Sequence, residues 1–376
     1  MHVYFDNAAT TPVDPLVLDA MWPVMATEFG NPSSIHHFGR KTRNHIELAR
    51  KQIAHYLGVA PSELFFTSGG TEADNMVLQQ CTEAFGVKHI ITAKTEHHAV
   101  EHTAKILEQQ GKIKLHWVQT DSKGNIDLEH LEGLLKSNPD ALVSLMHANN
   151  EIGTLLPLDK VGQLCESYKA LFHSDTVQTM GHYALQPKRD KVHFMTCAAH
   201  KFHGPKGIGF LYMDGAHKLT PLIHGGAQER QMRGGTENVA GIVGLAKAFE
   251  LCYTEMETHQ AHIFGLKQEF MAGLKNIIPD IEFNGETDFE KALYTVLNCR
   301  FPEHPDAEML LFNLDIKGIA ASGGSACSSG SNQGSHVLRA LGVNMNKPSV
   351  RFSFSKFNTS QEIQYTLNTL KHLLTN

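Results

Sequence analysis

Short apolar runs alternate with one-sided helical patterns along the first half of the chain. The periodicity is clearest over 40–57, where Ile46, Ile53 and Leu57 recur on one face and basic residues occupy the other. Strands are predicted at 64–67, 88–92, 115–119, 141–146 and 171–173, and helices at 72–80, 100–109, 128–135 and 161–170. This alternation predicts an α/β fold with a mainly parallel sheet and helices on both faces.

The second half of the chain has a different pattern. A long helical stretch runs from about 239 to beyond 264, and a helix of that length often links two domains. Beyond it the sequence predicts a smaller α+β unit with strands near 294–298 and 350–354 and helices over 306–313 and 359–374. We therefore predict a large domain over 15–255 and a small domain formed by 1–14 with 256–376.

The N-terminal segment carries turn and helix signals. A short strand at 3–5 leads into a turn-rich loop, and Asp14 followed by Pro15 predicts the start of a helix. The residues Asn-Pro-Ser-Ser at 31–34 predict that a second helix begins there.

Polar loops follow several of the predicted strands. They lie at 68–71, 95–98, 149–153, 174–178 and 198–204. Because ligands of open α/β sheets bind beyond the carboxyl ends of the strands, we expect these loops to line one crevice. The loop at 68–71 joins a strand to a helix through two glycines, which is typical of a phosphate cradle, although it lacks the lysine of a Walker motif.

Composition excludes several classes of protein. Hydrophobic residues are 41% of the chain and charged residues 19%, the profile of a globular protein. The net charge of -6 argues against direct binding to nucleic acid. With no apolar run able to cross a bilayer and no secretion signal, we expect a cytoplasmic protein. The 6 cysteines form no CxxC pair, so neither a zinc cluster nor a disulfide framework is indicated.

Lys201 is the first candidate for chemistry. It lies between a small-residue turn and the apolar run at 208–212, with His200 and His203 beside it. A single lysine is commonly a solvated surface charge, but one that is partly desolvated near other cations loses its proton more easily. Its amine is then a nucleophile that can form a Schiff base with an aldehyde such as pyridoxal phosphate.

A series of short motifs resembles those of the cysteine desulfurases. The motifs are DNAATT (6–11), GNPSS (30–34), TSGGTEADN (67–75), Glu96-His97, NNEIG (149–153), His200-Lys201, RGGTEN (233–238), GSACSS (324–329) and Arg351-Phe352-Ser353. They occur in one order over nearly the whole chain. These proteins are class-V aminotransferase-like pyridoxal-phosphate enzymes with the aspartate aminotransferase fold, known as fold type I, so the resemblance implies that fold and that cofactor.

The resemblance implies a role for each matching residue. Lys201 is the lysine that holds the cofactor, Asp175 pairs with its pyridine nitrogen, and His97 stacks on its ring. A carboxylate at the nitrogen keeps the ring protonated, so the ring can accept electrons from a substrate carbanion. Other cofactor contacts are implied for Gly70, Thr71, Asn150, Gln178, His200 and Thr236. Thr236 matches a residue contributed by a second subunit, which implies a homodimer with shared sites, and no metal is implied.

The substrate side of the reaction rests on two further matches. Arg351 and Asn150 match residues that bind the substrate, and a guanidinium is well shaped to hold a carboxylate. Cys327 matches the nucleophile whose thiolate attacks the sulfur of L-cysteine, leaving an enzyme persulfide and L-alanine. The long loop around Cys327 resembles the branch that passes sulfur through protein partners to iron-sulfur clusters and thiolated tRNA.

Two departures from the family pattern bear on the site. Ala198 stands where the family usually has a serine or threonine that binds the cofactor phosphate. The residues at 332–334 and 354–356 also differ from the usual Leu-Glu-Pro and Leu-Gly-Arg. Cofactor affinity and loop docking are the properties that these changes affect.

Three alternatives stay open on the sequence. A lyase or aminotransferase acting on another amino acid shares most of the motifs, and Cys327 argues against it. His98 and His102 fit the HxxEH pattern of an inverted zinc protease, a short motif that arises easily among 24 histidines. A silent scaffold that only binds partners is disfavoured by Lys201, Asp175 and Cys327.

Overall fold

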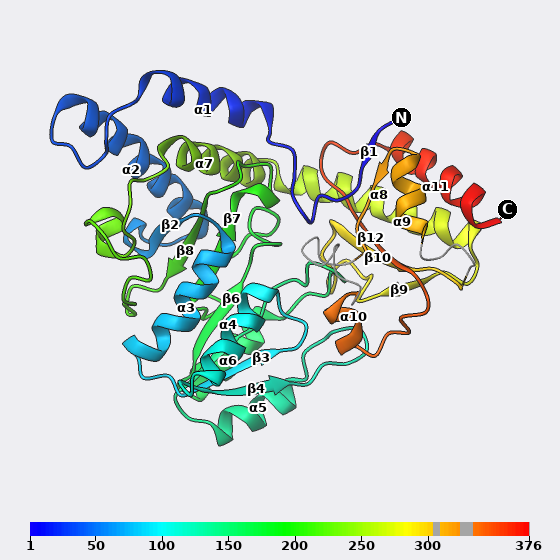
Figure 1. Ribbon diagram of the computed structural model, residues 1–376, viewed down its shortest axis with the longest axis horizontal. Coiled ribbons are helices and arrows are strands. Elements are labelled where there is room, and N and C mark those ends of the chain that lie inside the picture. The colour runs from blue at the N-terminus through cyan, green and yellow to red at the C-terminus, as the bar shows by residue number, and fades with distance from the viewer. Residues whose placement is uncertain (304–308, 324–333, 376) are drawn as a thin grey trace.

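The computed structural model describes residues 1–303, 309–323 and 334–375 (Figure 1). Within them the main sheet has seven strands in the order β2-β8-β7-β6-β5-β3-β4. Their bounds are Leu64–Thr67 (β2), His89–Ala93 (β3), Lys114–Val118 (β4), Ala141–Ser144 (β5), Leu171–Asp175 (β6), Phe194–Ala198 (β7) and Gly209–Met213 (β8). The strands β3 to β7 pair in parallel, while β8 runs antiparallel to β2 and β7. The predicted mainly parallel sheet is confirmed.

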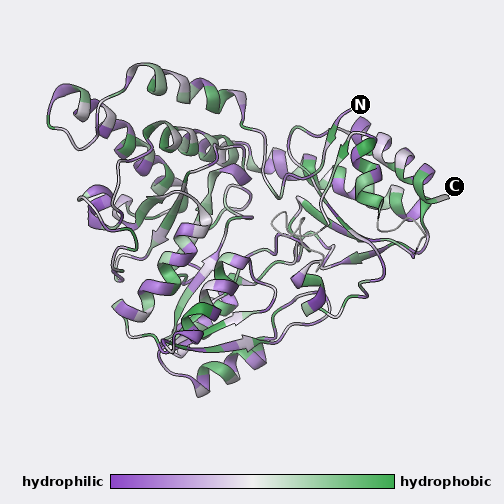
Figure 2. Ribbon diagram, in the orientation of Figure 1, coloured by the Kyte–Doolittle hydropathy of each residue, from purple (hydrophilic) through white to green (hydrophobic). Residues whose placement is uncertain are grey.

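Helices cover both faces of this sheet, as predicted. Their bounds are Pro15–Thr27 (α1), His37–Leu57 (α2), Gly70–Ala84 (α3), His98–Gln109 (α4), Leu128–Ser137 (α5), Leu158–Ser167 (α6) and Val239–Thr254 (α7). Alternation along β8 separates the faces: Phe210 and Tyr212 pack with α2 and α7, whereas Leu211 and Met213 pack with α3 and α4. Both hydrophobic and hydrophilic residues occur along these helices, as expected for helices that pack one face against the sheet (Figure 2).

A second core lies after α7. Its antiparallel sheet has the order β12-β10-β9, and β1 pairs in parallel with β11. The bounds are Val3–Tyr4 (β1), Glu282–Asn284 (β9), Val296–Arg300 (β10), Ile319–Ala320 (β11), Ser349–Ser353 (β12), Met256–Ile277 (α8), Leu310–Ile316 (α9), His336–Ala340 (α10) and Ser360–Thr375 (α11). Phe5 packs in this core with Phe270 and Phe352, and Figure 1 places both termini here. The two cores support the division into 15–255 and 1–14 with 256–376, which stays a prediction.

Two helix predictions need correction, and a third is tested only in part. The stretch from 239 is not one helix, because Glu255 has non-helical angles (φ -113°, ψ 14°) and separates α7 from α8. The two helices bury their apolar residues in different cores, which one straight helix would not do. The segment 31–34 closes a turn through the Asn31 side chain, and α2 begins only at His37. The helix α9 begins at Leu310, and residues 306–308 of its predicted start lie outside the described residues.

No helix among the described residues is both long enough and apolar enough to span a membrane.

Candidate active site

The loops that follow the strands of the main sheet converge on one cavity of about 250 Å³. Each of the five polar loops predicted from the sequence contributes to its lining, so the expected crevice is present. The predicted site residues that line it are Gly70, Thr71, His97, Asn150, Asp175, Gln178, His200, Lys201 and Arg351. The structure therefore brings together residues from both halves of the chain.

Lys201 enters this cavity from a 3-10 turn between β7 and β8. Its Nζ donates hydrogen bonds to the carbonyl oxygens of Ala8 and Ala9, at 2.7 and 2.9 Å. These carbonyls belong to the N-terminal loop and hold the lysine beside the other lining residues. The amine of Lys201 therefore faces the cavity and is not the solvated surface charge that a single lysine commonly is.

Two buried carboxylates face the same cavity. Asp175 ends β6, where its Oδ1 accepts a hydrogen bond from the Val177 N–H at 2.9 Å. Burial, with a smaller effect of the Asp74 carboxylate, raises the pKa of Asp175 to about 7. Burial likewise raises the pKa of Asp74 to about 7. Two carboxylates that resist ionisation together provide a site for a cation, since a positive charge between them would lower both pKa values.

Asp74 was not singled out from the sequence, although it lies in the TSGGTEADN motif. It follows Gly70 by one helical turn on α3, so the two share a face directed at the cavity. Its Oδ1 lies 3.4 Å from Nε2 of His173. Burial lowers the pKa of His173 to about 4, so this histidine is neutral near pH 7 and does not neutralise Asp74.

His97 caps the N-terminus of α4 and lines the cavity. Its Nδ1 accepts a hydrogen bond from the Ala99 N–H at 3.2 Å, which leaves the proton of the neutral ring on Nε2. Burial, followed by the positive charge of Lys201, lowers the pKa of His97 to about 4. A neutral imidazole is therefore present beside the lysine at physiological pH, able to stack on a ring and to exchange a proton.

The start of α3 lines the cavity with the backbone of Gly70 and Thr71. Gly69, the cap residue, has φ 152°, a conformation that glycine adopts readily, and a Cβ added to Gly70 would lie 2.8 Å from a Val177 methyl group. The free N–H groups and positive dipole end of a helix favour an anion such as a phosphate. Ala198 also lines the cavity, so the departure noted in the sequence places a methyl group there instead of a hydroxyl.

Arg351 lies on β12 and reaches the cavity from the second core. Its Nη2 forms an ion pair with Asp6 Oδ1 at 2.8 Å, and its Nη1 donates to the carbonyl oxygen of Asn150, also at 2.8 Å. Only 1% of the side chain is exposed, which rules out the surface ion pair that a lone arginine commonly makes. Its Nε has no hydrogen-bond partner among the described residues, so the guanidinium retains an unused donor.

Two of the predicted residues are not placed in this cavity. Thr236 lines a separate pocket of about 180 Å³ with Ser68 and Arg233. Cys327 lies outside the described residues. The described cysteines are all buried, and burial raises the pKa of each thiol, as expected for unreactive cysteines; they are Cys81, Cys165, Cys197, Cys252 and Cys299.

The residues of the cavity fit pyridoxal phosphate. Lys201 offers an amine for its aldehyde, the helix start at Gly70 suits its phosphate, and the carboxylates of Asp74 and Asp175 suit a protonated pyridine nitrogen. Asp74 Oδ1 accepts no hydrogen bond from the described residues, an orphaned buried oxygen that favours a cationic partner. His98 and His102 do not line the cavity.

Comparisons with known proteins agree with this α/β fold. The family model "Aminotransferase class-V" matches residues 3–366. A protein of Dictyoglomus turgidum named cysteine desulfurase IscS is 42% identical over 99% of this chain and 94% of its own length. A solved structure described as a NifS-like protein has a TM-score of 0.92 and 38% identity, with 100% of both chains covered. Another, described as SspA in complex with cysteine, has a TM-score of 0.82 and 32% identity, covering 95% of this chain and 100% of that one.

The fold and the family matches define a pyridoxal-phosphate-dependent enzyme with the predicted aspartate aminotransferase fold. The chain belongs to the class-V aminotransferase family and, within it, to the cysteine desulfurases.

Proposed function

We propose that this enzyme removes sulfur from L-cysteine, using pyridoxal phosphate held by Lys201, and yields L-alanine and a persulfide on Cys327. The observation that carries the proposal is the convergence of Lys201, Asp175 and Arg351 on one cavity. The solved relative described as a complex with cysteine supports the same substrate.

The bound cofactor would supply an electron sink for the substrate carbon. Asp175 would hold a negative charge at the ring nitrogen, and Asp74, which has a carboxylate oxygen within 4.8 Å of one of Asp175, would share that task. His97 is neutral and has an N–H on Nε2, so it is suited to move a proton near the lysine. Gly70, Thr71 and His200 would hold the phosphate, and Gln178 and Asn150 the ring hydroxyl.

Arg351 would bind the substrate carboxylate. The guanidinium is buried, charged and paired with Asp6, so a substrate carboxylate has to share the arginine with that side chain or displace it. Exchange of one carboxylate for another avoids leaving a buried positive charge without a partner, which would be costly.

The sulfur step belongs to Cys327. Its thiolate attacks the sulfur of the bound substrate, an S–S bond forms, and the bond between that sulfur and the substrate Cβ breaks. The bonding electron pair stays with the carbon, which later takes up a proton and leaves as part of L-alanine. The persulfide sulfur then passes to a protein acceptor, for iron-sulfur clusters or tRNA thiolation, in the cytoplasm.

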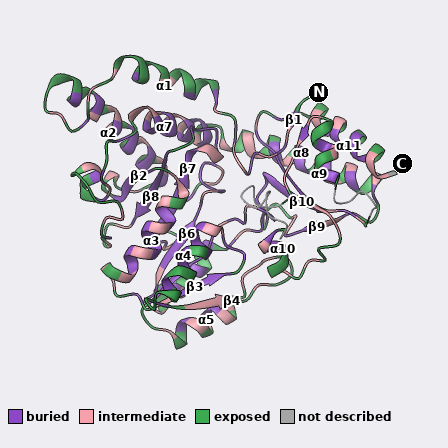
Figure 3. Cartoon of the chain, viewed as in Figure 1, coloured by how far each residue is buried: buried purple, intermediate pink, exposed green. Residues whose placement is uncertain are grey.

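We further propose a homodimer with shared sites. Large apolar side chains are exposed on α1, on the segment that follows it and at the start of α2 (Figure 3); they are Leu16, Leu18, Trp22, Met25, Phe29, Ile35 and Phe38. Such a concentration on one region is typical of an interface. Because Thr236 lines a different pocket in its own chain, a second copy is the source that would supply it to the Lys201 cavity.

A direct assay tests the activity. The purified protein is incubated with L-cysteine and a thiol reductant, and alanine and sulfide are measured together. The proposal predicts equal amounts of both, with the visible absorbance of bound cofactor before substrate is added. L-serine and L-aspartate serve as competing substrates: a faster reaction with either, without sulfide from L-cysteine, would favour a lyase or aminotransferase acting on another amino acid.

A further inference from the structure

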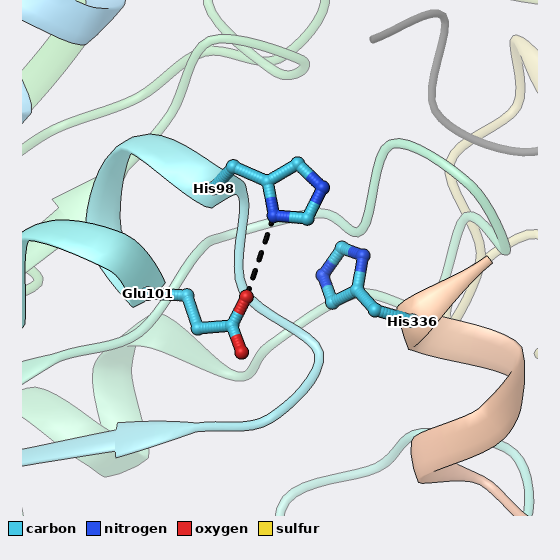
Figure 4. A group of neighbouring side chains, drawn as sticks. All are labelled: His98, Glu101 and His336. Atoms are coloured by element: carbon cyan, nitrogen blue, oxygen red, sulfur yellow. Dashed lines mark hydrogen bonds and ion pairs between the residues drawn. The ribbon is translucent and has the colours of Figure 1, made fainter. Parts of the chain in front are cut away.

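A second group of side chains with metal-binding chemistry lies outside the cofactor cavity. His98 and Glu101 are at the start of α4, and His336 is the first residue of α10 (Figure 4). One ligand atom from each residue lies within 4.8 Å of the other two. The HxxEH pattern seen in the sequence supplies two of the three, while the third comes from a helix far along the chain.

The spacing of these atoms suits a small divalent ion. Zn²⁺ binds histidine nitrogen and carboxylate oxygen at about 2.0–2.2 Å in tetrahedral geometry, which places neighbouring ligand atoms roughly 3.3–3.5 Å apart. His98 Nδ1 and Glu101 Oε2 are already 3.3 Å apart. The rings of His98 and His336 have centroids 4.2 Å apart, and both rings face the carboxylate in Figure 4. Small side-chain rotations complete the triangle.

Neighbouring groups hold these side chains in place. The second oxygen of Glu101, Oε1, is bound by Lys105 Nζ at 2.5 Å, which leaves Oε2 for the histidines. His336 Nε2 lies 2.8 Å from the carbonyl oxygen of Glu96, a contact that keeps this ring against the loop before α4. His102 Nε2 lies 3.9 Å from Glu101 Oε2, with 63% of its side chain exposed, so either this ring or a water is available as a fourth ligand.

We propose that His98, Glu101 and His336 form a Zn²⁺ site that fastens α10 to α4. Each histidine binds the ion as a neutral ring, so its single ring proton has to sit on the other nitrogen: through exchange with solvent, the proton of His98 moves from Nδ1 to Nε2 and that of His336 from Nε2 to Nδ1. When the ion is bound, His336 Nε2 turns from the Glu96 carbonyl to the metal. A ligand set of two neutral imidazole rings and one carboxylate favours Zn²⁺ over Mg²⁺ or Ca²⁺, which prefer oxygen ligands.

This site does not depend on the proposed desulfurase reaction, because none of its three residues lines the cofactor cavity. It adjoins that cavity through His97, which precedes His98 in the chain. The site differs from the zinc hydrolase considered from the sequence, since its third ligand is His336 and not His102.

The test uses the holoenzyme without a polyhistidine tag, stripped of metal, in the wild type and in Cys327→Ser so that the thiol does not compete. Calorimetric titration with Zn²⁺ is expected to show one ion per chain in both. His98→Asn, Glu101→Gln and His336→Asn should each weaken binding at least tenfold, whereas His372→Asn, a change at an exposed histidine on α11, should leave it unchanged. Co²⁺ should give the absorption of a tetrahedral site at wavelengths beyond those of the cofactor.

Lys105→Gln provides a check that does not remove a ligand. It takes a positive charge away from Glu101 while the glutamine amide keeps a donor for Oε1, so Zn²⁺ should bind more tightly to this variant than to the wild type. The proposal is overturned if the wild type binds no ion, if the three ligand variants bind Zn²⁺ as tightly as the wild type, or if Lys105→Gln binds it more weakly. If a ligand variant does not fold, the Lys105→Gln titration and the Co²⁺ spectrum still decide the outcome.

Discussion

The cavity is lined by an acidic pair, Asp74 and Asp175, and by Arg351, which forms an arginine pair with Asp6; the two pairs are stabilised in different ways. Burial raises both pKa values of the acidic pair to about 7, so its charge is incomplete until a cation arrives. In the arginine pair, by contrast, the Arg351 guanidinium already has a carboxylate partner, because Nη2 lies 2.8 Å from Asp6 Oδ1. The acidic pair therefore gains from binding a cationic ring, whereas the arginine pair exchanges one carboxylate for another.

The largest effect is expected from the acidic pair. Asp175→Asn keeps the shape but removes the charge at the ring nitrogen, and hydrogen bonds to charged groups contribute roughly 1.5–3 kcal/mol. We expect kcat to fall on the order of a hundredfold while the absorbance of bound cofactor persists. Steady-state alanine release measures this, with Asp159→Asn, an exposed position on α6, as control. An unchanged kcat would assign the electrostatic role to Asp74 instead.

Substitutions in the arginine pair should mainly change the KM for L-cysteine. Arg351→Lys retains a positive charge but loses the planar fork, so KM for L-cysteine should rise about tenfold, equivalent to ~1.4 kcal/mol. Asp6→Asn should lower KM, because it removes the carboxylate that competes with the substrate. If both substitutions raise KM equally, Asp6 positions the arginine and the exchange described above is wrong.

The acidic pair should also give the cofactor-free protein a distinct pH dependence. A carboxyl with a raised folded pKa holds a proton that the unfolded chain has lost, so folding stability falls as pH rises from about 4 towards 7. Asp74→Asn removes one such group and lowers the pKa of the other. The free energy of unfolding of this variant, relative to the wild type, should therefore increase between pH 5 and pH 7, by up to about 1.4 kcal/mol per pH unit for each group.

Urea titrations at the two pH values measure that difference. Other buried histidines with lowered pKa values, such as His147 and His203, act in the opposite direction in both proteins, so their contributions cancel in the comparison. A relative stability that stays flat with pH would mean that the two carboxylates are ionised in the cavity.

The smallest effect is expected at the phosphate end. Ala198→Ser would add a hydroxyl donor to the cavity, and we expect pyridoxal phosphate to bind up to about tenfold more tightly, or ~1.4 kcal/mol. Equilibrium dialysis of the cofactor with both proteins measures the change. Equal or weaker affinity in the variant would show that the cavity already compensates for the missing hydroxyl.

The sequence predicted much of this arrangement, for identifiable reasons. Strong periodicity located the strands and helices of the main sheet, and the rule that polar loops gather at carboxyl ends located the cavity. The pattern did not predict the break at Glu255, because both flanking helices are apolar enough to continue the same periodicity. Boundaries such as the start of α2 depend on turn hydrogen bonds that composition alone does not reveal.

The candidate site was predicted from sequence motifs. The residues that the sequence did not identify are those brought to the site only by tertiary contacts. Asp74 lies within the TSGGTEADN motif, but its burial beside Asp175, which depends on packing between α3 and β6, marks it as a site residue. The carbonyls of Ala8 and Ala9, which bind Lys201, carry no side-chain signal at all. His336 joins His98 only through the packing of α10 on α4, which no local pattern reports.

The Cys327→Ser variant separates the chemistry of the cavity from sulfur transfer most directly. Its resting visible spectrum should match that of the wild type, and L-cysteine should still change that spectrum, because Lys201, Asp175 and Arg351 are intact. Alanine release should fall by orders of magnitude, and mass spectrometry should find no protein persulfide. Alanine formed from L-cysteine at near the wild-type rate would contradict the role of Cys327 and the desulfurase reaction proposed for this cavity.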